Sequence, residues 1–318
     1  MSSSPATAPI RAPFDLHCHI LPAWDDGPKT LELSLGMIER ALKAGIETIV
    51  ATPHVGRAFR GVEHPAASIP AGVERLQTEL DSRGLGVKIV PGAEILLGSV
   101  DLRREGGILP EWTVGGMKKY ALVESPYGSW PNFGNELLYE LGRRGVKPII
   151  AHPERYVDVQ KDIAKIETAV RQGALLQITA GSILGQTTKE MQNSCFQLLD
   201  AGWVHLVASD AHNNSHAWPG ETIKTVEKRV GSARARQIFE DNPRAVLEGQ
   251  SLARQAAPEK SSSGLGRLFG ARRLRYKKQR KGPRGCDAPF ACFCCLFSCH
   301  FRFSLQQQNS VWQERMYN

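Results

Sequence analysis

Helix-like and strand-like stretches alternate along most of the chain. Residues 28–44 carry apolar side chains three or four positions apart, from Leu31 to Leu42, and Gly45 follows at once. The next residues, 46–51, are apolar and β-branched, as in a strand that is buried on both faces. This order predicts an amphipathic helix, a glycine turn and a buried strand.

The same junction recurs further along the chain. In each case a helical stretch ends at a glycine suited to a left-handed helix C-cap, and an apolar strand follows. The glycines are Gly45, Gly84, Gly145, Gly173 and Gly202. Seven strands are predicted in all, at residues 14–20, 46–51, 87–90, 120–123, 147–151, 175–178 and 204–208, with a last short helix at 243–247. Repeated βα units favour an α/β fold, and we expect a distorted TIM-like (β/α)7 barrel rather than an open doubly wound sheet.

The positive charge of the chain belongs to its last part. The 318 residues have a formal net charge of +8, but from Arg254 onward there are 13 Lys+Arg against 3 Asp+Glu. We therefore interpret residues 1–13 as a flexible leader, 14–253 as the folded body and 254–318 as a basic, cysteine-rich tail that is expected to be disordered. No nucleic-acid partner is expected for the body. The tail could contact a membrane or another anionic surface.

The cysteines are divided in the same way as the charge. The body holds only Cys18 and Cys195, whereas five cysteines lie in the tail. Two unrelated cysteines are typical of a reducing compartment, and the N-terminus has neither the basic segment nor the apolar core of a signal peptide. We therefore expect a cytoplasmic protein. A zinc site is an alternative use of the tail cysteines, although their spacing does not match a scheme of Cys-x-x-Cys pairs.

Polar side chains gather at the C-terminal ends of the predicted strands, where catalytic barrels carry their functional groups. His17 and His19 are two positions apart on a strand and therefore face the same side, and Asp25 and Asp26 lie on the loop that follows. Five further strands run into residues that can bind a metal. These residues are His54, Glu94, Glu124, His152, Asp210 and His212, whereas the sixth strand ends with Gln177 and Thr179.

Each of these residues has a simpler explanation when it is taken alone. His54 could cap a helix, Glu94 and Glu124 could be surface carboxylates, and Asp210 could be a helix N-cap. None of these explanations predicts that the residues share one end of the strands, whereas a polynuclear metal site does. Other routes to hydrolysis lack their motifs. The chain has no cysteine and arginine at the spacing of cysteine phosphatases, no Gly-Lys-Ser/Thr phosphate loop and no Gly-x-Ser-x-Gly elbow.

In this order the motifs resemble the PHP (polymerase and histidinol phosphatase) superfamily and, within it, the bacterial manganese-dependent tyrosine-protein phosphatases of the CpsB/CapC type. The similarity runs from about residue 14 to residue 250, and the tail resembles nothing in that family. The segments that carry it are Asp15-x-His17-x-His19, Asp25-Asp26-Gly27, Thr52-Pro53-His54, Pro91-Gly92-Ala93-Glu94, Glu124-Ser125-Pro126, His152-Pro153-Glu154-Arg155, Ser209-Asp210-Ala211-His212 and Asn242-Pro243-Arg244-Ala245.

The resemblance implies a barrel of the PHP type that holds three divalent ions, usually Mn²⁺, at the C-terminal ends of its strands. Fe or Zn²⁺ would also suit the mixed nitrogen and carboxylate donors. Asp15 and Asp25 would orient ligands or loop backbone, and Cys18 would face away from the ions. By resemblance, one ion is bound by His17, His19, Glu94 and Asp210, a second by Glu94, Glu124 and His152, and a third by Asp26, His54 and His212.

The implied reaction is hydrolysis of a phosphate monoester by hydroxide formed at the ions. Arg155 would bind the phosphate, and the alternative for this residue is a salt bridge with Glu154 or another neighbour. The implied substrate is phosphotyrosine on a bacterial tyrosine autokinase that controls capsule or exopolysaccharide synthesis. The alternatives are a small-molecule phosphatase, such as one for histidinol phosphate, and a non-catalytic binding module that uses the basic tail.

The sequence departs from the family pattern at one position. Relatives commonly carry a second arginine shortly after the Asp-x-His pair, whereas residues 213–218 contain none. His216, Arg57 or Arg60 could take its place. The departure concerns phosphate affinity and substrate preference, because the metal ligands themselves are all present.

Overall fold

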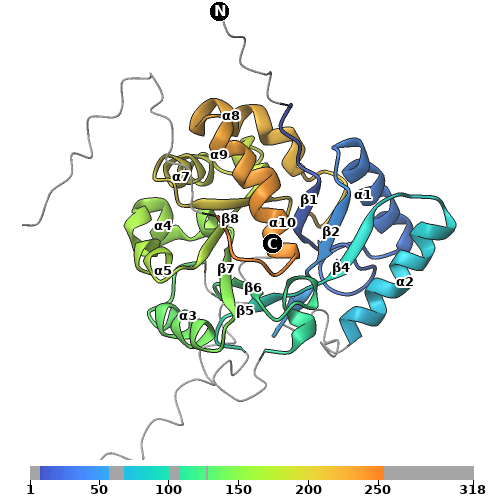
Figure 1. Cartoon of the computed structure of the whole chain (residues 1–318), viewed down its shortest axis with the longest axis horizontal. Helices are drawn as coiled ribbons and strands as arrows, with labels where there is room; N and C mark the ends of the chain where they lie inside the picture. The colour runs from blue at the N-terminus through green and yellow to red at the C-terminus, as the bar shows by residue number, and fades with distance from the viewer. Residues whose placement is uncertain (1–7, 57–67, 100–107, 127, 254–318) are drawn as a thin grey trace, which may run out of the picture. The chain divides into compact units, whose positions relative to one another are not determined.

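The computed structural model of the protein describes residues 8–56, 68–99, 108–126 and 128–253. The predictions made for the basic, cysteine-rich tail lie outside the described residues, as do those for Arg57 and Arg60 and for the first seven residues of the leader. The expected α/β fold is confirmed for the body. All of its strand pairs are parallel, and helices connect most of the successive strands (Figure 1).

The described strands form two parallel sheets, one of three strands in the order β1-β2-β4 and one of six in the order β3-β5-β6-β7-β8-β9. Each predicted strand is present, with ends that differ from the expected ones by at most two residues. The strands are β1 (Phe14–Cys18), β2 (Thr48–Ala51), β3 (His54–Val55), β4 (Lys88–Pro91), β5 (Glu94–Leu96), β6 (Tyr120–Glu124), β7 (Lys147–Ala151), β8 (Leu175–Thr179) and β9 (Val204–Ala208).

The strands β3 and β5 were not predicted, and each continues the strand before it after a break. Pro53 has no N–H to donate to a strand ladder, which separates β3 from β2. Gly92 lies between β4 and β5, where a Cβ atom would be 2.7 Å from Val50 Cγ1, so only glycine fits there without a shift. After these breaks β3 pairs with β5, and His54 lies directly beside Glu94.

The first and last strands meet at their C-terminal ends. Asp210 N–H donates to the carbonyl of His17 at 2.8 Å, and His19 N–H donates to the carbonyl of Ala211 at 3.0 Å. Cys18 and Ala211 form an isolated parallel bridge between the same two segments. Residues about two hundred positions apart in the sequence are thereby fixed side by side.

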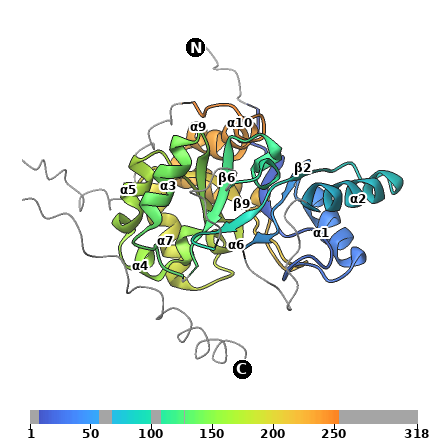
Figure 2. The ribbon, with the colours of Figure 1, turned by 90° about the horizontal axis from the view of Figure 1, so that it is seen from below.

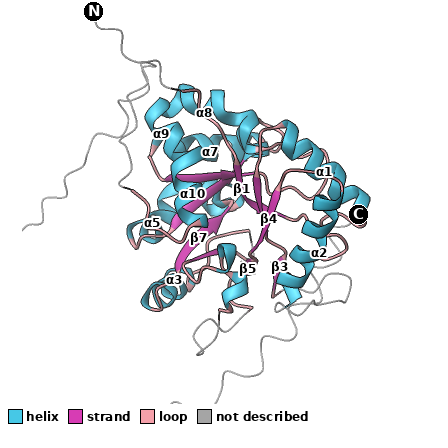
Figure 3. Ribbon diagram, turned by 45° about the vertical axis from the view of Figure 1, so that its right-hand side comes forward, coloured by secondary structure: helices cyan, strands magenta, loops and turns pink. Residues whose placement is uncertain are grey.

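The helices lie outside the strands (Figure 3). Helices α1 and α2 lie beside β2 and β4, on the side away from α3, α4 and α5 (Figure 2). The α-helices are α1 (Leu31–Lys43), α2 (Ile69–Ser82), α3 (Gly134–Arg143), α4 (Val157–Lys161), α5 (Glu167–Arg171), α6 (Ala180–Ile183), α7 (Lys189–Asp200), α8 (Ile223–Val230), α9 (Ser232–Arg236) and α10 (Asn242–Leu247). Short 3₁₀ turns and one π-helical turn, Gln237–Asp241, complete the described elements.

Local sequence signals set the ends of the helices. The first helix begins at Leu31, three residues later than predicted, because the side chain of Thr30 caps it by accepting from Leu33 N–H. The five glycines predicted to end helices all have left-handed backbones, with φ between 65° and 94°. That prediction is confirmed, and its physical reason is that glycine has no Cβ to oppose this conformation.

Both faces of the strands are buried. Ile150, Leu176 and Val207 pack in the larger apolar cluster with the helices, whereas their neighbours Ile149 and Leu175 belong to a second cluster on the other face. Each fully buried Leu or Ile contributes about 1.5–3 kcal/mol relative to an exposed one, so the strands are held from both sides. Among the described helices none has the length and apolar character needed to span a membrane.

Candidate metal centre

The predicted metal ligands come together at the C-terminal ends of the strands. Two of them, His152 after β7 and Asp210 after β9, have left-handed backbones, with φ of 32° and 51°. This conformation is uncommon for residues other than glycine. Strain of this kind is concentrated at functional sites, where the surrounding structure compensates for its cost.

The most deeply buried group of donors is formed by His17, His19, Glu94 and Asp210, whose ligand atoms all lie within 4.8 Å of one another. Each of the four residues has an exposed fraction of 1% or less. His17 Nε2 lies 3.4 Å from Glu94 Oε2 and 3.1 Å from Asp210 Oδ1, and His19 Nε2 lies 3.4 Å from each of the same two oxygens. The four residues come from three strands.

The other ring nitrogen of each of these histidines has a fixed partner. His17 Nδ1 lies 2.9 Å from Gln177 Oε1, and His19 Nδ1 lies 2.7 Å from Asp25 Oδ2. Both partners are acceptors, so Nδ1 carries a proton, and in the neutral imidazole that a metal would bind the lone pair of Nε2 faces the carboxylates. Atoms that all carry lone pairs repel one another unless a cation lies between them, and metal-binding histidines are commonly oriented in this way.

His54 joins this group to a second one. Its Nδ1 lies 3.1 Å from Glu94 Oε2 and 3.2 Å from Glu124 Oε1, and these three residues form a second set of close ligand atoms. His152 Nε2 lies 2.8 Å from the other oxygen of Glu94. Glu94 is therefore in contact with histidines from three strands, β1, β3 and β7.

A third set lies nearer the surface and consists of His19, Asp26, His54 and His212. Asp26 Oδ1 lies 3.2 Å from His212 Nε2 and 3.5 Å from His54 Nε2. The Asp26 side chain is 46% exposed, in contrast to the buried carboxylates. His54 thus lies close to both the second and third sets, whereas the resemblance assigns it to one ion.

The buried carboxylates create a strong demand for positive charge. Burial lowers the pKa of His17, but the charges of Glu94 and Asp210 outweigh this effect and raise it to about 9. Burial likewise raises the pKa of Glu94, yet the charges of His17 and His54 hold it well below its ordinary value. In the metal-free protein, protons on the histidines would neutralise the charge of these carboxylates. A divalent ion would neutralise it without protonating the ligands.

The donor set fits divalent transition metals. Asp210 Oδ1 is buried and has no hydrogen bond of suitable geometry, although two imidazole nitrogens lie within 3.4 Å of it. An oxygen in this position is well placed to bind an ion that the nitrogens also bind. Mixed imidazole and carboxylate donors suit Mn²⁺, Fe or Zn²⁺ better than Ca²⁺, which prefers oxygen alone.

Arg155 lies at the edge of the buried group. Its Nη2 is 2.5 Å from Asp210 Oδ2, and its side chain is 35% exposed. This contact is of the kind named as the alternative for Arg155, a salt bridge with Glu154 or another neighbour, and the partner is Asp210. Glu154 Oε1 accepts from the N–H and the hydroxyl of Thr179, at 2.9 and 2.8 Å. Arg155 therefore contacts a candidate metal ligand on one side and solvent on the other.

Three supporting residues are not among the predicted metal ligands. Gln177, at the end of the strand that offers no ligand, orients His17. Asp15 accepts from the N–H and the hydroxyl of Ser209, at 3.0 and 2.5 Å, and so fixes the turn before Asp210. His216 lies beside His212, with ring centroids 5.8 Å apart. In the sequence, the only sign that β8 also faces the site was that Gln177 and Thr179 lie two positions apart at its end and so point to the same side.

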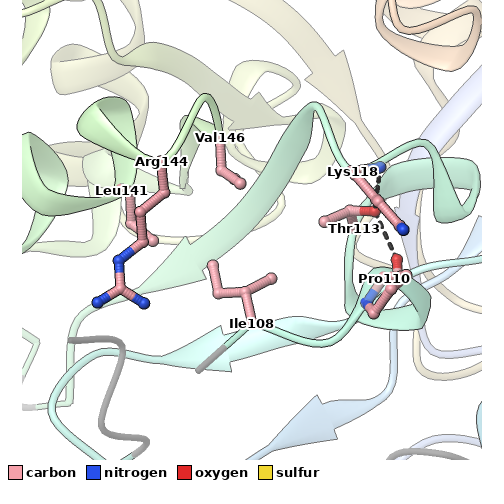
Figure 4. A pocket seen from close by; sticks show the side chains of 7 residues that line it. All are labelled: Ile108, Pro110, Thr113, Lys118, Leu141, Arg144 and Val146. Atoms are coloured by element: carbon pink, nitrogen blue, oxygen red, sulfur yellow. Dashed lines mark hydrogen bonds between the residues drawn. The ribbon is translucent and has the colours of Figure 1, made fainter. Parts of the chain in front are cut away.

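Two cavities are described, and one of them lies beside the metal donors. One of about 300 Å³ is lined by Ile108, Pro110, Thr113, Lys118, Leu141, Arg144 and Val146 (Figure 4). It lies where β6 and β7 begin, whereas the metal donors lie where strands end. The other, of about 290 Å³, shares Asp26 and His212 with the third set of donors.

Comparisons with known proteins agree with this geometry. Residues 13–248 match the family described as capsular polysaccharide synthesis, CpsB/CapC. The chain is 34% identical over 249 residues to the tyrosine-protein phosphatase YwqE of Bacillus subtilis (strain 168), covering 76% of this chain and 94% of YwqE. It is 31% identical over 247 residues to the tyrosine-protein phosphatase CpsB of Streptococcus agalactiae serotype III (strain NEM316), covering 75% of this chain and all of CpsB.

A solved structure is also similar. It is described as belonging to YwqE from Bacillus subtilis and CpsB from Streptococcus pneumoniae, unique metal-dependent tyrosine phosphatases. The match covers 78% of this chain and 99% of the solved chain, with a TM-score of 0.68 and 31% sequence identity.

Proposed function

The chain belongs to the CpsB/CapC family of capsular polysaccharide synthesis, and on that premise we propose that it is a metal-dependent protein-tyrosine phosphatase. Its substrate in this proposal is phosphotyrosine on a bacterial tyrosine autokinase that controls capsule or exopolysaccharide synthesis. The observation that carries the proposal is the meeting of three sets of histidine and carboxylate donors, which are joined through Glu94, His19 and His54, with a partly exposed arginine at their edge.

We propose three divalent ions, Mn²⁺ in the first place, as the cofactors of this site. The ligands would be those implied by the resemblance: His17, His19, Asp26, His54, Glu94, Glu124, His152, Asp210 and His212. When bound, such ions neutralise phosphoryl oxygens and lower the pKa of a water molecule, which supplies a nucleophile at neutral pH.

Side chains of the protein would bind the phosphate and orient the metal ligands. Arg155 has N–H groups left over beyond its contact with Asp210, and a guanidinium can bind two phosphoryl oxygens at once. Gln177 and Asp25 hold the rings of His17 and His19 with Nε2 toward the donors. Phenol has a pKa of about 10, so tyrosine is a good leaving group and needs little assistance from a general acid.

Two further expectations are part of the proposal. The pairing order supports a distorted (β/α)7 barrel of the PHP type, because β3 continues β2, β5 continues β4, and the end of β9 is bridged to β1. A cytoplasmic location is supported by the free thiols of Cys18 and Cys195, both buried in the body.

The test is turnover of a phosphotyrosine peptide by the full-length protein loaded with Mn²⁺, compared with turnover of histidinol phosphate. We expect the peptide to be the better substrate. Asp210→Asn should reduce turnover by at least about a hundredfold, because it removes a charge on which the ions and Arg155 depend. Asp200→Asn is the matched control, since Asp200 is exposed and pairs only with Arg229 among the described residues.

The result can go against the proposal in two ways. If only histidinol phosphate is consumed, the substrate assignment is wrong and the small-molecule alternative stands. If neither is consumed with Mn²⁺, Fe²⁺ or Zn²⁺, while the protein is folded, the catalytic assignment fails and a binding function remains.

A further inference from the structure

A cavity of about 290 Å³ lies next to the third set of donors and is not used by the mechanism above. Asp26 and His212 form its boundary with the metal centre. Lys29, two residues before α1, and Leu33, in the first turn of that helix, also line the cavity. A group bound at the metal centre would therefore have this cavity as its immediate neighbour.

One wall of the cavity is apolar without being part of the core. Leu33 is 46% exposed, and it lies off the face of α1 that packs inward through Leu35, Ile38 and Ala41. The cap bond from Leu33 N–H to Thr30 fixes the backbone of this wall. An exposed leucine alone needs no explanation, but here it borders a cavity that opens beside the candidate catalytic site.

Lys29 gives the cavity an unpaired positive charge. It is exposed, and it forms no ion pair with any of the residues that the structure describes. The carboxylate of Asp26 is already engaged with His212 and His54. The carboxylate of Glu32, the next acid after Lys29 along the chain, interacts with Thr30 and with the start of its own helix. An acidic group that entered the cavity would find Lys29 available.

The opposite wall is held in place by α1. Asn213 Oδ1 accepts from the N–H and hydroxyl of Ser215, which closes a tight turn. Arg40 donates to the carbonyl of Asn214, and the Asn214 side chain packs over Gly36, where a Cβ atom would lie 2.8 Å from its Nδ2. Hydrogen bonds thus fix the backbone at Leu33 and at Asn213 and Asn214, which favours a cavity that is formed before a ligand binds.

From these contacts we infer that the cavity binds the side chain of an acidic residue adjacent to the phosphotyrosine of the substrate. The methylene groups of a glutamate would pack on Leu33, and its carboxylate would pair with Lys29. The inference rests on the proposed phosphatase activity and adds a preference for acidic flanking residues. It also gives the residues from Lys29 to Leu33 a role in substrate selection, next to the predicted metal ligand Asp26.

The experiment compares phosphotyrosine peptides that differ only in having Glu or Gln next to the phosphotyrosine, on either side, with the Mn²⁺-loaded full-length protein. For at least one side we expect the KM of the Glu peptide to be about two- to fivefold lower than that of the Gln peptide at low salt, with kcat unchanged. This is the size of effect that an exposed ion pair produces. Lys29→Met keeps the apolar stem and removes the charge, so it should abolish this preference. High salt should also weaken it.

Lys43→Met is the control, because Lys43 is an exposed lysine at the other end of α1. It should retain the preference for Glu. Turnover of p-nitrophenyl phosphate, which has no flanking residue, should be the same in all three proteins. Equal KM values for Glu and Gln peptides in the unmodified protein, or a preference that persists in Lys29→Met, would overturn the inference. Failure to hydrolyse p-nitrophenyl phosphate would instead count against the phosphatase activity itself.

Discussion

Replacing Gln177 with methionine would test how strongly the metal centre depends on a residue that binds no ion. Methionine has nearly the same length, but its sulfur is only a weak hydrogen-bond acceptor for the N–H of His17 Nδ1, which lies 2.9 Å from Gln177 Oε1. Both residues are fully buried, so no water is expected to replace the lost acceptor. His17 would be free to turn or to adopt the other tautomer, with Nε2 protonated toward the carboxylates.

Two magnitudes follow from this geometry. Loss of a partner that orients a metal-binding histidine weakens metal affinity by about 10- to 100-fold, or about 1.4–2.8 kcal/mol. An unpaired buried N–H costs about 1–3 kcal/mol of folding stability. For a domain of this size each kcal/mol corresponds to about 2–4 °C in Tm, so the metal-free variant should unfold about 2–12 °C lower than the unmodified protein.

The assays are calorimetric titration of Mn²⁺ into metal-free protein and thermal unfolding with and without Mn²⁺. Gln177→Glu keeps an acceptor oxygen for His17 and should retain Mn²⁺ affinity to within a few-fold. Gln192→Met is the control for loss of a glutamine amide elsewhere, since Gln192 bonds Ile183 and Lys189 away from the donors. If Gln177→Met lowers Tm but leaves Mn²⁺ affinity unchanged, Gln177 only supports packing and the tautomer argument is refuted.

Three further predictions concern the same site. Gly27→Ala should weaken Mn²⁺ binding and lower Tm, because the new Cβ would lie 2.5 Å from the His19 carbonyl oxygen and displace the loop that carries Asp25 and Asp26; an unchanged titration curve would contradict this. In metal-free protein the pKa of His17, raised to about 9, contributes stability that is fully present below about pH 6.5 and lost as the pH rises toward 9. Thermal unfolding should therefore show Tm falling over this interval without metal but much less with Mn²⁺, where the ligands are already deprotonated; a flat metal-free profile would refute the coupling. Mn²⁺ at a hundred times its Kd should add about 2.7 kcal/mol, or about 5–11 °C in Tm, and EDTA should reverse the gain. If Mn²⁺ and EDTA leave Tm unchanged, the donors do not bind an ion in the folded protein.

The order of elements could be predicted well because it depends on local chemistry. Glycine at a helix end adopts a left-handed backbone whatever surrounds it, and all five predicted positions do so. Apolar runs after those glycines become strands because both of their faces can be buried. The two additional strands, β3 and β5, were missed because a break at Pro53 or Gly92 does not reveal whether pairing resumes beyond it.

The sequence by itself determined which residues are candidates for the metal centre and that they belong at one end of the strands. Alternation along a strand places His17 and His19 on one face, and the parallel βα pattern directs the ends of the strands the same way. Only the tertiary structure decided which donors are neighbours, that His54 lies beside Glu94, that Gln177 orients His17, and that Arg155 contacts Asp210. The physical reason is that spacing along the chain fixes the direction of a side chain within its own element. The distances between elements depend on packing and hydrogen bonds among residues far apart in the sequence.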